Sequence, residues 1–183
     1  ASGACFFIRK EVYHQLNGFD ATFFAHQEEI DLCWRAFNAG FTTKYNPKSV
    51  VYHVGGATLK EENPMKTYLN FRNSLYTLMK NEPITHLLWK IPARFILDGF
   101  AAILYLVTKD RHFVMSILKA HLSFYKNFRR VLQKRAEGNS LVRALRTKER
   151  NTVVGRYSKL IVLDYYLFNK KTFKDTNLNN FFC

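Results

Sequence analysis

The dipeptide Asn63-Pro64 divides the chain into two parts that differ in charge and in hydrophobic pattern. Residues 1–62 contain six basic and seven acidic residues, whereas residues 63–183 contain 22 basic and seven acidic ones. The first part mixes short apolar runs with helical patterns, and the second consists mainly of long helical patterns rich in Lys, Arg and aromatic residues. We therefore expect a boundary near Asn63 and a strongly basic helical region after it.

The second part carries clear signals for helix starts and ends. Asn63 can cap a helix and Pro64 suits its first turn, which predicts a helix to about Asn81 that Pro83 ends. Pro92 is expected to open a second helix that reaches about Thr108. A third is expected over residues 111–135, with an apolar stripe at helical spacing, and residues 136–150 are expected to form a mobile loop. The stripe consists of Phe113, Ile117, His121, Phe124 and Phe128.

The first part contains patterns for both strands and helices. The apolar run Ala4–Ile8 and the β-branched run Ser49–Val54 are each typical of a short buried strand. A short helix is expected over residues 11–16, ended by Asn17-Gly18. Residues 28–39 form a helical pattern that Gly40 ends, with Ile30, Trp34 and Phe37 on one face.

Length and composition describe a globular protein. The length of 183 residues suits one domain with a small extension. The composition, 48% hydrophobic and 23% charged residues, excludes a disordered tail. Three cysteines without a Cys-x-x-Cys pair predict reduced thiols in a cytosolic compartment. The sequence begins at Ala1 and enters an apolar run at once, so we expect a fragment whose N-terminal part is missing.

Three carboxylates lie close together at the start of the helical pattern over residues 28–39: Glu28, Glu29 and Asp31. A carboxylate that stays ionised at the edge of a pocket can take a proton from a hydroxyl nucleophile. Acidic residues are also common in the first turn of helices, where they favour the helix dipole without any catalytic role. From the spacing alone both interpretations remain open.

The order of several short motifs resembles that of bacterial family 2 glycosyltransferases. Those proteins carry a Gly-Ala pair with a following Arg, a Gly-Phe-Asp turn before a Phe-Phe pair, an acidic pair that leads into a helix, and a Pro followed by a His. The match covers about residues 1–80 and is specific because the motifs keep their order. The residues are Gly3-Ala4 with Arg9, Asn17-Gly18-Phe19-Asp20, Phe23-Phe24, Glu28 to Arg35, Pro47 and His53, with Arg72-Asn73 further along.

The resemblance implies an α/β fold, the C-terminal half of a GT-A (Rossmann-like α/β/α) glycosyltransferase domain followed by basic amphipathic helices. Residues 1–62 would be the acceptor-side part of the catalytic domain, residues 63–136 a helical, basic region at a membrane surface, and residues 137–183 a basic loop with an aromatic-rich tail. The family's nucleotide-binding half carries an Asp-x-Asp motif, which these 183 residues lack. We therefore expect residues 1–183 alone to be inactive.

The function that the resemblance implies is inverting transfer of a sugar from a nucleotide-sugar donor to a glycan or lipid-linked acceptor, in the synthesis of cell-surface polysaccharide. By position Glu29 is the general base, although the family usually has Asp there, and the role could shift to Glu28 or Asp31. Asp31 is also expected to organise the helix by pairing with Arg35.

The resemblance also implies a divalent metal, Mg²⁺ or Mn²⁺, with His53 as a ligand or as a contact of the diphosphate. A single His in a strand is otherwise most often a packed core residue. Gly55 and Gly56 would let the following loop close over donor phosphates, or would simply mark a turn.

Two further residues have a functional and a structural interpretation. The forked guanidinium of Arg72 suits a diphosphate, but it could equally be a solvated charge on its helix. Trp34 could stack on a sugar ring, and at helical spacing with Ile30 and Phe37 it could equally belong to the core.

The basic helices predict a location on the cytoplasmic side, peripheral on the inner face of the cell membrane, where anionic lipids attract Lys and Arg. Residues 84–107 contain Lys90, Arg94 and Asp98 on one face, which favours an amphipathic helix on a membrane over a spanning one. The alternative function is a non-catalytic basic module that binds anionic membrane or nucleic acid. Nucleic acid is the less favoured partner, because no signature of a known nucleic-acid-binding domain is present.

Overall fold

The computed structural model of the chain describes residues 3–53, 63–108, 110–146, 157, 161–172 and 175. The chain divides into two compact units, Ala1–Thr147 and Lys148–Cys183. The first unit holds every residue of the candidate site, and the second is described by itself.

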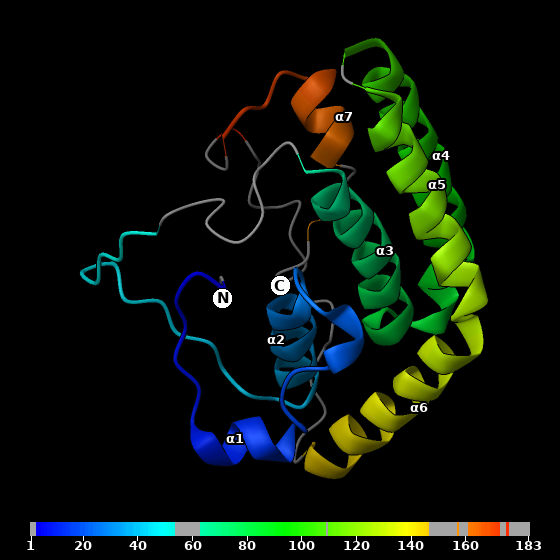
Figure 1. The fold of residues 1–183 in the computed structure, drawn as a ribbon. Coiled ribbons are helices and arrows are strands. Elements are labelled where there is room, and N and C mark those ends of the chain that lie inside the picture. The colour runs from blue at the N-terminus through cyan, green and yellow to red at the C-terminus, as the bar shows by residue number, and fades with distance from the viewer. Residues whose placement is uncertain are drawn as a thin grey trace. The chain divides into compact units, whose positions relative to one another are not determined.

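The described part of the first unit is helical (Figure 1). A short helix and a 3₁₀ turn precede α2, and four longer helices follow the Asn63-Pro64 boundary. The elements are α1 (Lys10–Gln15), η1 (Ala21–Phe23), α2 (Glu28–Asn38), α3 (Pro64–Asn81), α4 (Ile84–Thr108), α5 (Arg111–Lys126) and α6 (Phe128–Leu145).

The predicted α/β fold is wrong for the part of the chain that the structure describes, since none of those residues forms a strand. Residues 4–8 are irregular, and Phe6 and Ile8 pack against a small core beside α1 and α2. Residues 49–53 are irregular and exposed, and Val54 lies outside the described residues. The described chain therefore contains no half of a GT-A domain with a sheet.

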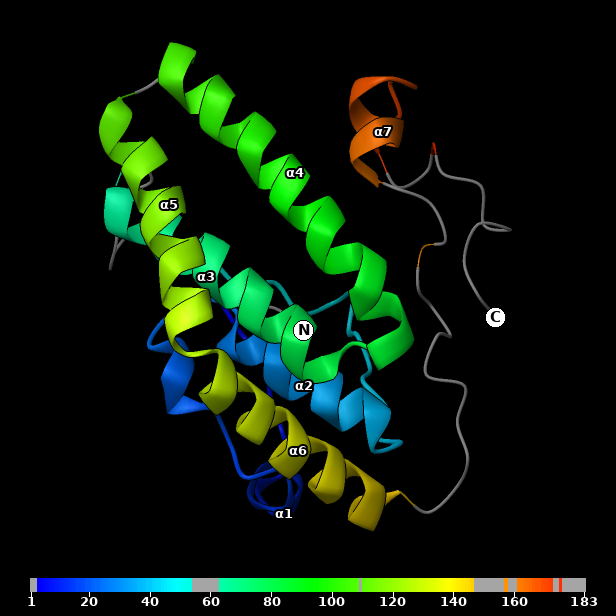
Figure 2. The same ribbon diagram turned by 90° about the vertical axis from the view of Figure 1, so that its right-hand side faces the viewer.

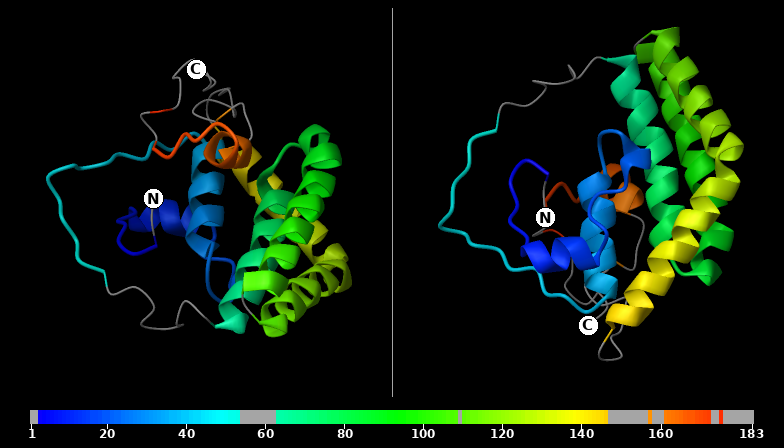
Figure 3. Two further views of the ribbon diagram at one scale, coloured as in Figure 1. Left: turned by 90° about the horizontal axis from the view of Figure 1, so that it is seen from above. Right: turned by 60° about the horizontal axis from the view of Figure 1, so that its bottom comes forward.

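The physical reason lies in what a strand needs. A β-branched run becomes a strand only when a neighbouring strand completes its backbone hydrogen bonds and covers its side chains. Figure 3 shows the segment from Phe41 to His53 running away from the helices in both views, and residues 42–53 are all exposed. The sequence pattern identifies the β-branched residues of this run, but it does not show whether a partner strand is present.

Helix α3 lies at the centre of the first unit and packs against α2, α4, α5 and α6 (Figure 2). Its buried face supplies Leu75, Tyr76 and Met79 to the main core. Phe23 of η1 reaches this core from the first part of the chain and meets the Tyr76 ring edge to face. The two parts of differing charge are thus joined through one apolar cluster.

A second, smaller core lies beside α1 and α2. It is centred on the buried residues Leu16, Leu32 and Ala39. Val142 and Leu145, near the end of α6, pack against it. The last helix of this unit therefore contacts both cores, since Val131 near its start belongs to the main one.

Several predicted helix boundaries are confirmed. The Asn63 side chain accepts a hydrogen bond from the Met65 amide and caps α3, whose first residue is Pro64. Helix α2 ends before Gly40, and α1 covers most of residues 11–16. The stripe on α5 is confirmed for Phe113, Ile117 and Phe124, which are buried.

Other boundaries differ from the prediction. Helix α4 begins at Ile84 and keeps Pro92 inside it, because the Pro83 carbonyl already accepts bonds from the His86 and Leu87 amides. The expected third helix breaks at Asn127, whose side chain donates to the Ser123 carbonyl and competes with the helical pattern.

The predicted mobile loop over residues 136–150 is wrong as far as Leu145, because α6 continues to that residue. Its contacts with the rest of the unit explain the difference. Arg135 donates to the carbonyls of Met79 and Glu82 at the end of α3, and Val142 and Leu145 are held by the smaller core. Packing of this kind overrides the weak helix propensity of Gly138 and Asn139.

In the second unit the structure describes α7 (Ile161–Tyr166) and its immediate surroundings. The buried Asp164 carboxylate accepts hydrogen bonds from the Tyr157 hydroxyl and from the Lys170 ammonium. This charge raises the pKa of Lys170, chiefly through the hydrogen bond.

Candidate functional site

The candidate site lies around the loop from Asp20 to Gln27, which leads into the first turn of α2. Its backbone is unusual, because Phe24, His26 and Gln27 all have positive φ angles of 66° to 70°. Residues other than Gly rarely adopt this region, and it costs of order 1–3 kcal/mol at each position. Contacts from elsewhere in the fold must therefore hold the loop in place.

Those contacts come from Arg72 and Asn73 in the middle of α3. The buried Asn73 amide donates to the carbonyls of Phe23, Ala25 and His26 at 3.0, 2.7 and 2.7 Å. The Arg72 guanidinium donates to the Phe23 carbonyl at 2.8 Å and to the Thr22 carbonyl at 3.2 Å. The carbonyls of this irregular loop thus accept hydrogen bonds from side chains of the rigid helix α3.

The same helix supplies the centre of a buried charge network. Asp31 of α2 is fully buried and accepts from Arg35 at 3.0 Å, from Lys80 at 3.0 Å and from Asn81 at 2.8 Å. The predicted Asp31–Arg35 pair is confirmed. Every bond of this carboxylate is structural, so the structure places Asp31 as an organiser of the site and away from its solvent-exposed edge.

Arg35 and Lys80 extend the network to the turn before the loop. Arg35 donates to the carbonyls of Leu16 and Gly18, and Lys80 also reaches Asp20 at 2.5 Å. A larger residue at the position of Gly18 would be strained, because its φ is +57° and a Cβ there would lie 2.8 Å from the Tyr13 ring. The Gly-Phe-Asp motif is therefore a tight turn fixed by charges from α2 and α3.

Burial alone would raise the pKa of the Asp20 carboxyl. The hydrogen bond and charge of Lys80, helped by hydrogen bonds from Thr22, outweigh that effect and lower the pKa to about 2. Asp20 thus remains a carboxylate at neutral pH and serves the turn, since its side chain also accepts from the Thr22 amide at 3.0 Å.

Glu28 and Glu29 stand at the start of α2, immediately after the held loop. Both are half-buried, and neither makes an ion pair with any residue that the structure describes. Oε2 of Glu28 is buried and has no hydrogen-bond partner within the described chain, and the same is true of Nε2 of His26. A buried polar atom without a partner costs about 1–3 kcal/mol, so these two atoms are able to accept or donate a further hydrogen bond.

The carboxylate of Glu29 lies against the backbone of Gly3. A Cβ on Gly3 would come within 3.1 Å of Glu29 Cδ and 3.2 Å of Oε1. The first motif, Gly3-Ala4, is therefore next to the predicted base, although 26 residues separate them in sequence. A larger side chain at position 3 would have to displace this carboxylate.

Of the remaining predicted residues, Arg72 is bound to this loop by hydrogen bonds. Trp34 is half-buried on α2. His53 is exposed at the end of the irregular segment, and Gly55 and Gly56 lie outside the described residues. Among the residues described, no three His, Cys, Asp or Glu side chains gather where they could hold a metal ion. The described residues therefore assemble no site for the expected metal.

Three residues that matter here were not singled out as site residues from the sequence: Asp20, Asn73 and Lys80. Asp20 and Asn73 belong to quoted motifs, so the motifs gave a signal without a role. Lys80 stands near the end of a helix and gave no signal beyond a basic residue in a last turn. Only the fold shows that it pairs with two carboxylates that lie 49 and 60 residues earlier.

Helix α4 has its buried charge Asp98 on the protein side, and many of its apolar side chains are exposed. Asp98 is buried, pairs with Arg94 at 2.6 Å and contacts His121 of α5 at 2.9 Å. Phe100, Ile103 and Val107 are 65%, 63% and 80% exposed. By its length and composition α4 is able to cross a membrane, a property that it shares with core helices of soluble proteins.

Two curated proteins resemble this chain, both named N-acetylglucosaminyl-diphospho-decaprenol L-rhamnosyltransferase, from two strains of Mycobacterium tuberculosis, CDC 1551 and H37Rv. Each is 28% identical over 103 residues, which cover 56% of this chain. The matched segment spans 32% of the length of these relatives. The chain is thus distantly similar to a glycosyltransferase. No family model matches it, and no solved structure does.

Proposed function

We propose that the chain is the acceptor-side part of an inverting glycosyltransferase of the family 2 type, with Glu29 as the general base. The observation that carries the proposal is the contrast among the acidic side chains around the site. The half-buried Asp20 and the buried Asp31 are neutralised by ion pairs, whereas the half-buried Glu28 and Glu29 make no ion pair with any residue of the described chain. The similarity to a rhamnosyltransferase supports glycosyl transfer as the chemistry.

The proposed reaction needs one proton acceptor beside the acceptor hydroxyl. The hydroxyl oxygen forms a bond to the anomeric carbon of the donor sugar while the bond from that carbon to the nucleoside diphosphate breaks. The leaving diphosphate keeps the electron pair, and the hydroxyl proton passes to a carboxylate oxygen of Glu29. The dipole at the start of α2 favours the charged carboxylate before that step.

Glu28 and the loop would act by positioning. The hydrogen bonds from Arg72 and Asn73 hold the loop whose backbone leads directly into Glu28 and Glu29. The backbone that carries these two carboxylates is therefore fixed in position. The unpartnered Oε2 of Glu28 is then available to accept a hydrogen bond from a sugar hydroxyl. Glu28 and Glu29 therefore lie at the rigid start of α2, although the loop before them is irregular.

The test is Glu29→Gln in the longest native chain that contains residues 1–183, assayed with nucleotide-sugar donors and a polyprenyl-diphosphate-linked acceptor. We expect transfer to fall by about 10²- to 10⁴-fold, the usual contribution of a general base. Glu11→Gln on the exposed face of α1 is the matched control and should retain transfer. Turnover of Glu29→Gln equal to that of the unmodified chain would show that another group is the base.

We also propose that the reaction takes place at the inner face of the cell membrane, with a lipid-linked acceptor. The outward apolar face of α4 and the net charge of +14 support this location, because together they suit an anionic lipid surface. Binding to anionic vesicles, weakened by Phe100→Ser with Ile103→Ser, would support it. Binding to single-stranded RNA and not to vesicles would favour the basic-module alternative.

A further inference from the structure

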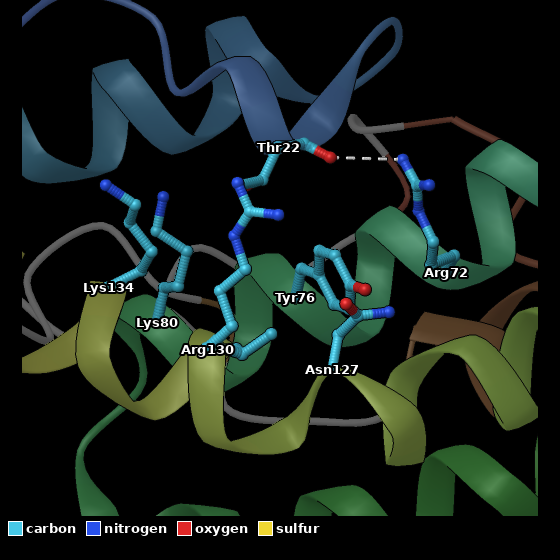
Figure 4. Close-up of a pocket in the computed structure, with 8 residues that line it drawn as sticks. Thr22, Arg72, Tyr76, Lys80, Asn127, Arg130 and Lys134 are labelled. Atoms are coloured by element: carbon cyan, nitrogen blue, oxygen red, sulfur yellow. Dashed lines mark hydrogen bonds between the residues drawn. The ribbon is translucent and has the colours of Figure 1, made fainter.

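A cavity of about 110 Å³ lies between η1, α3 and α6, and its lining is strongly basic (Figure 4). Arg72 and Lys80 line it from α3, and Arg130 and Lys134 line it from α6, while no lining residue is acidic. Figure 4 shows Lys80, Arg130 and Lys134 extending toward the loop that carries Thr22. The space exceeds that of a single water molecule several times, so a small polyatomic anion fits in it.

Within the described chain, two of the four positive charges have no acidic partner. Lys80 is shared by Asp20 and Asp31, and Lys134 contacts the exposed Glu137. Arg72 bonds only neutral groups, and Arg130 makes no ion pair with any residue of the described chain. The positive charges of Arg72 and Arg130 are not offset by a carboxylate of the described chain, so an anion that enters the cavity is attracted to them.

We propose that this cavity binds the diphosphate group of a substrate. Guanidinium groups are well shaped for phosphate oxygens, since each can donate two parallel hydrogen bonds. Tyr76 forms an apolar and aromatic wall beside these groups.

The cavity is connected to the proposed base through the chain. Thr22 lines it and lies seven residues before Glu29, on the loop that Arg72 and Asn73 hold. A diphosphate in the cavity would therefore be fixed by the same rigid unit that fixes the carboxylate. The source of the diphosphate rests on the proposed function, in which both the nucleotide-sugar donor and a lipid-linked acceptor carry one.

The experiment compares two double variants of equal charge change in the longest native chain that contains residues 1–183. Arg130→Gln with Lys134→Gln alters the cavity, and Lys126→Gln with Arg129→Gln alters exposed neighbours outside it. Affinity for inorganic diphosphate is measured by isothermal titration calorimetry at fixed ionic strength. We expect the cavity variant to bind at least about tenfold more weakly and the control to stay within about twofold.

Equal affinity of both variants, or an equal loss in both, would overturn the proposal, because the attraction would then be absent or nonspecific. The titration is repeated with a nucleoside diphosphate and with a farnesyl diphosphate. Selective loss for either one supports the proposal and assigns the source as donor or acceptor, and loss for neither overturns the substrate role. Because these measurements need no turnover, they stand even if Glu29→Gln shows that the base is a different residue.

Discussion

The loop from Asp20 to Gln27 and the segment from Phe41 to His53 flank the same helix, yet the fold treats them differently. The first is bound by six hydrogen bonds from α3 side chains to its backbone and to the Asp20 carboxylate. The second is irregular, and residues 42–53 are exposed. The first leads into Glu28 and Glu29 and the second ends at His53, and the resemblance to family 2 glycosyltransferases marked these residues as functional.

The difference shows what a motif requires before it becomes a site. The Glu28-Glu29 pair reaches its place because α3 lies within the described chain and supplies the donors that the strained loop needs. His53 follows a β-branched run with no neighbouring strand in the part of the chain that the structure describes. In both regions the residues match the motifs of the family. Only the contacts around those residues distinguish the two regions.

The largest effect is expected from the buried network under the held loop. Asp31→Ala removes the carboxylate that Arg35 and Lys80 share, and leaves two cations buried with less compensation. Breaking a buried ion pair in this way costs about 3–5 kcal/mol of the free energy of unfolding. Urea denaturation measures it, and a loss below about 1 kcal/mol would mean that the network does not hold the first unit together.

A smaller loss is expected from Asn73→Ala, which removes the donors of three loop carbonyls. We expect about 2–3 kcal/mol of destabilisation, because the Ala25 and His26 carbonyls lose the Asn73 donor and the Phe23 carbonyl keeps only its other donors, such as Arg72. Glycosyl transfer should fall by more than the folded fraction does, since the loop that precedes Glu28 is released.

The matched control is Asn46→Ala in the exposed segment. Its side chain accepts one hydrogen bond, from the Lys48 amide, in a solvated turn. A change within about 0.5 kcal/mol is expected for such a surface position. Equal losses for Asn46→Ala and Asn73→Ala would contradict the contrast between the two regions.

Local signals in the sequence were enough to predict α1, α2 and α3 and the cap at Asn63, because capping and helical periodicity depend on near neighbours. They failed where distant contacts decide. The α6 helix persists through Gly138 because α3 and the smaller core hold it. The run at residues 49–53 stays irregular because no strand adjoins it among the residues that the structure describes.

The candidate site divides in the same way. The resemblance pointed to Glu28, Glu29 and Asp31, and the structure places all three at the start of α2. The roles of Asn73 and Lys80 depend on contacts that span 47 to 60 residues, which no local pattern encodes. The basic cavity likewise joins α3 to α6, whose residues lie about 50 positions apart.

Acid should weaken the held loop through Asp20. Because its pKa in the folded chain is lowered to about 2 from an ordinary value of 3.8, its ion pair with Lys80 stabilises the fold above about pH 4. That contribution is lost as the pH falls from about 4 through 2. The urea midpoint of Asp20→Asn should therefore lie below that of the unmodified chain at pH 5 and approach it near pH 2.5. A constant difference across this range would show that the carboxylate is not held ionised by Lys80.

The smallest effect is expected in the exposed segment itself. Val51 and Tyr52 are 53% and 95% exposed, so Val51→Ser and Tyr52→Ser remove apolar surface that is already largely in water. Each should change the free energy of unfolding by no more than about 0.5 kcal/mol in residues 1–183, as surface substitutions usually do. The urea midpoint measures this directly, with Asn73→Ala beside it as the large reference. A loss above about 1 kcal/mol from either serine would mean that the segment is packed against the chain after all, and the two regions would then differ in degree and not in kind.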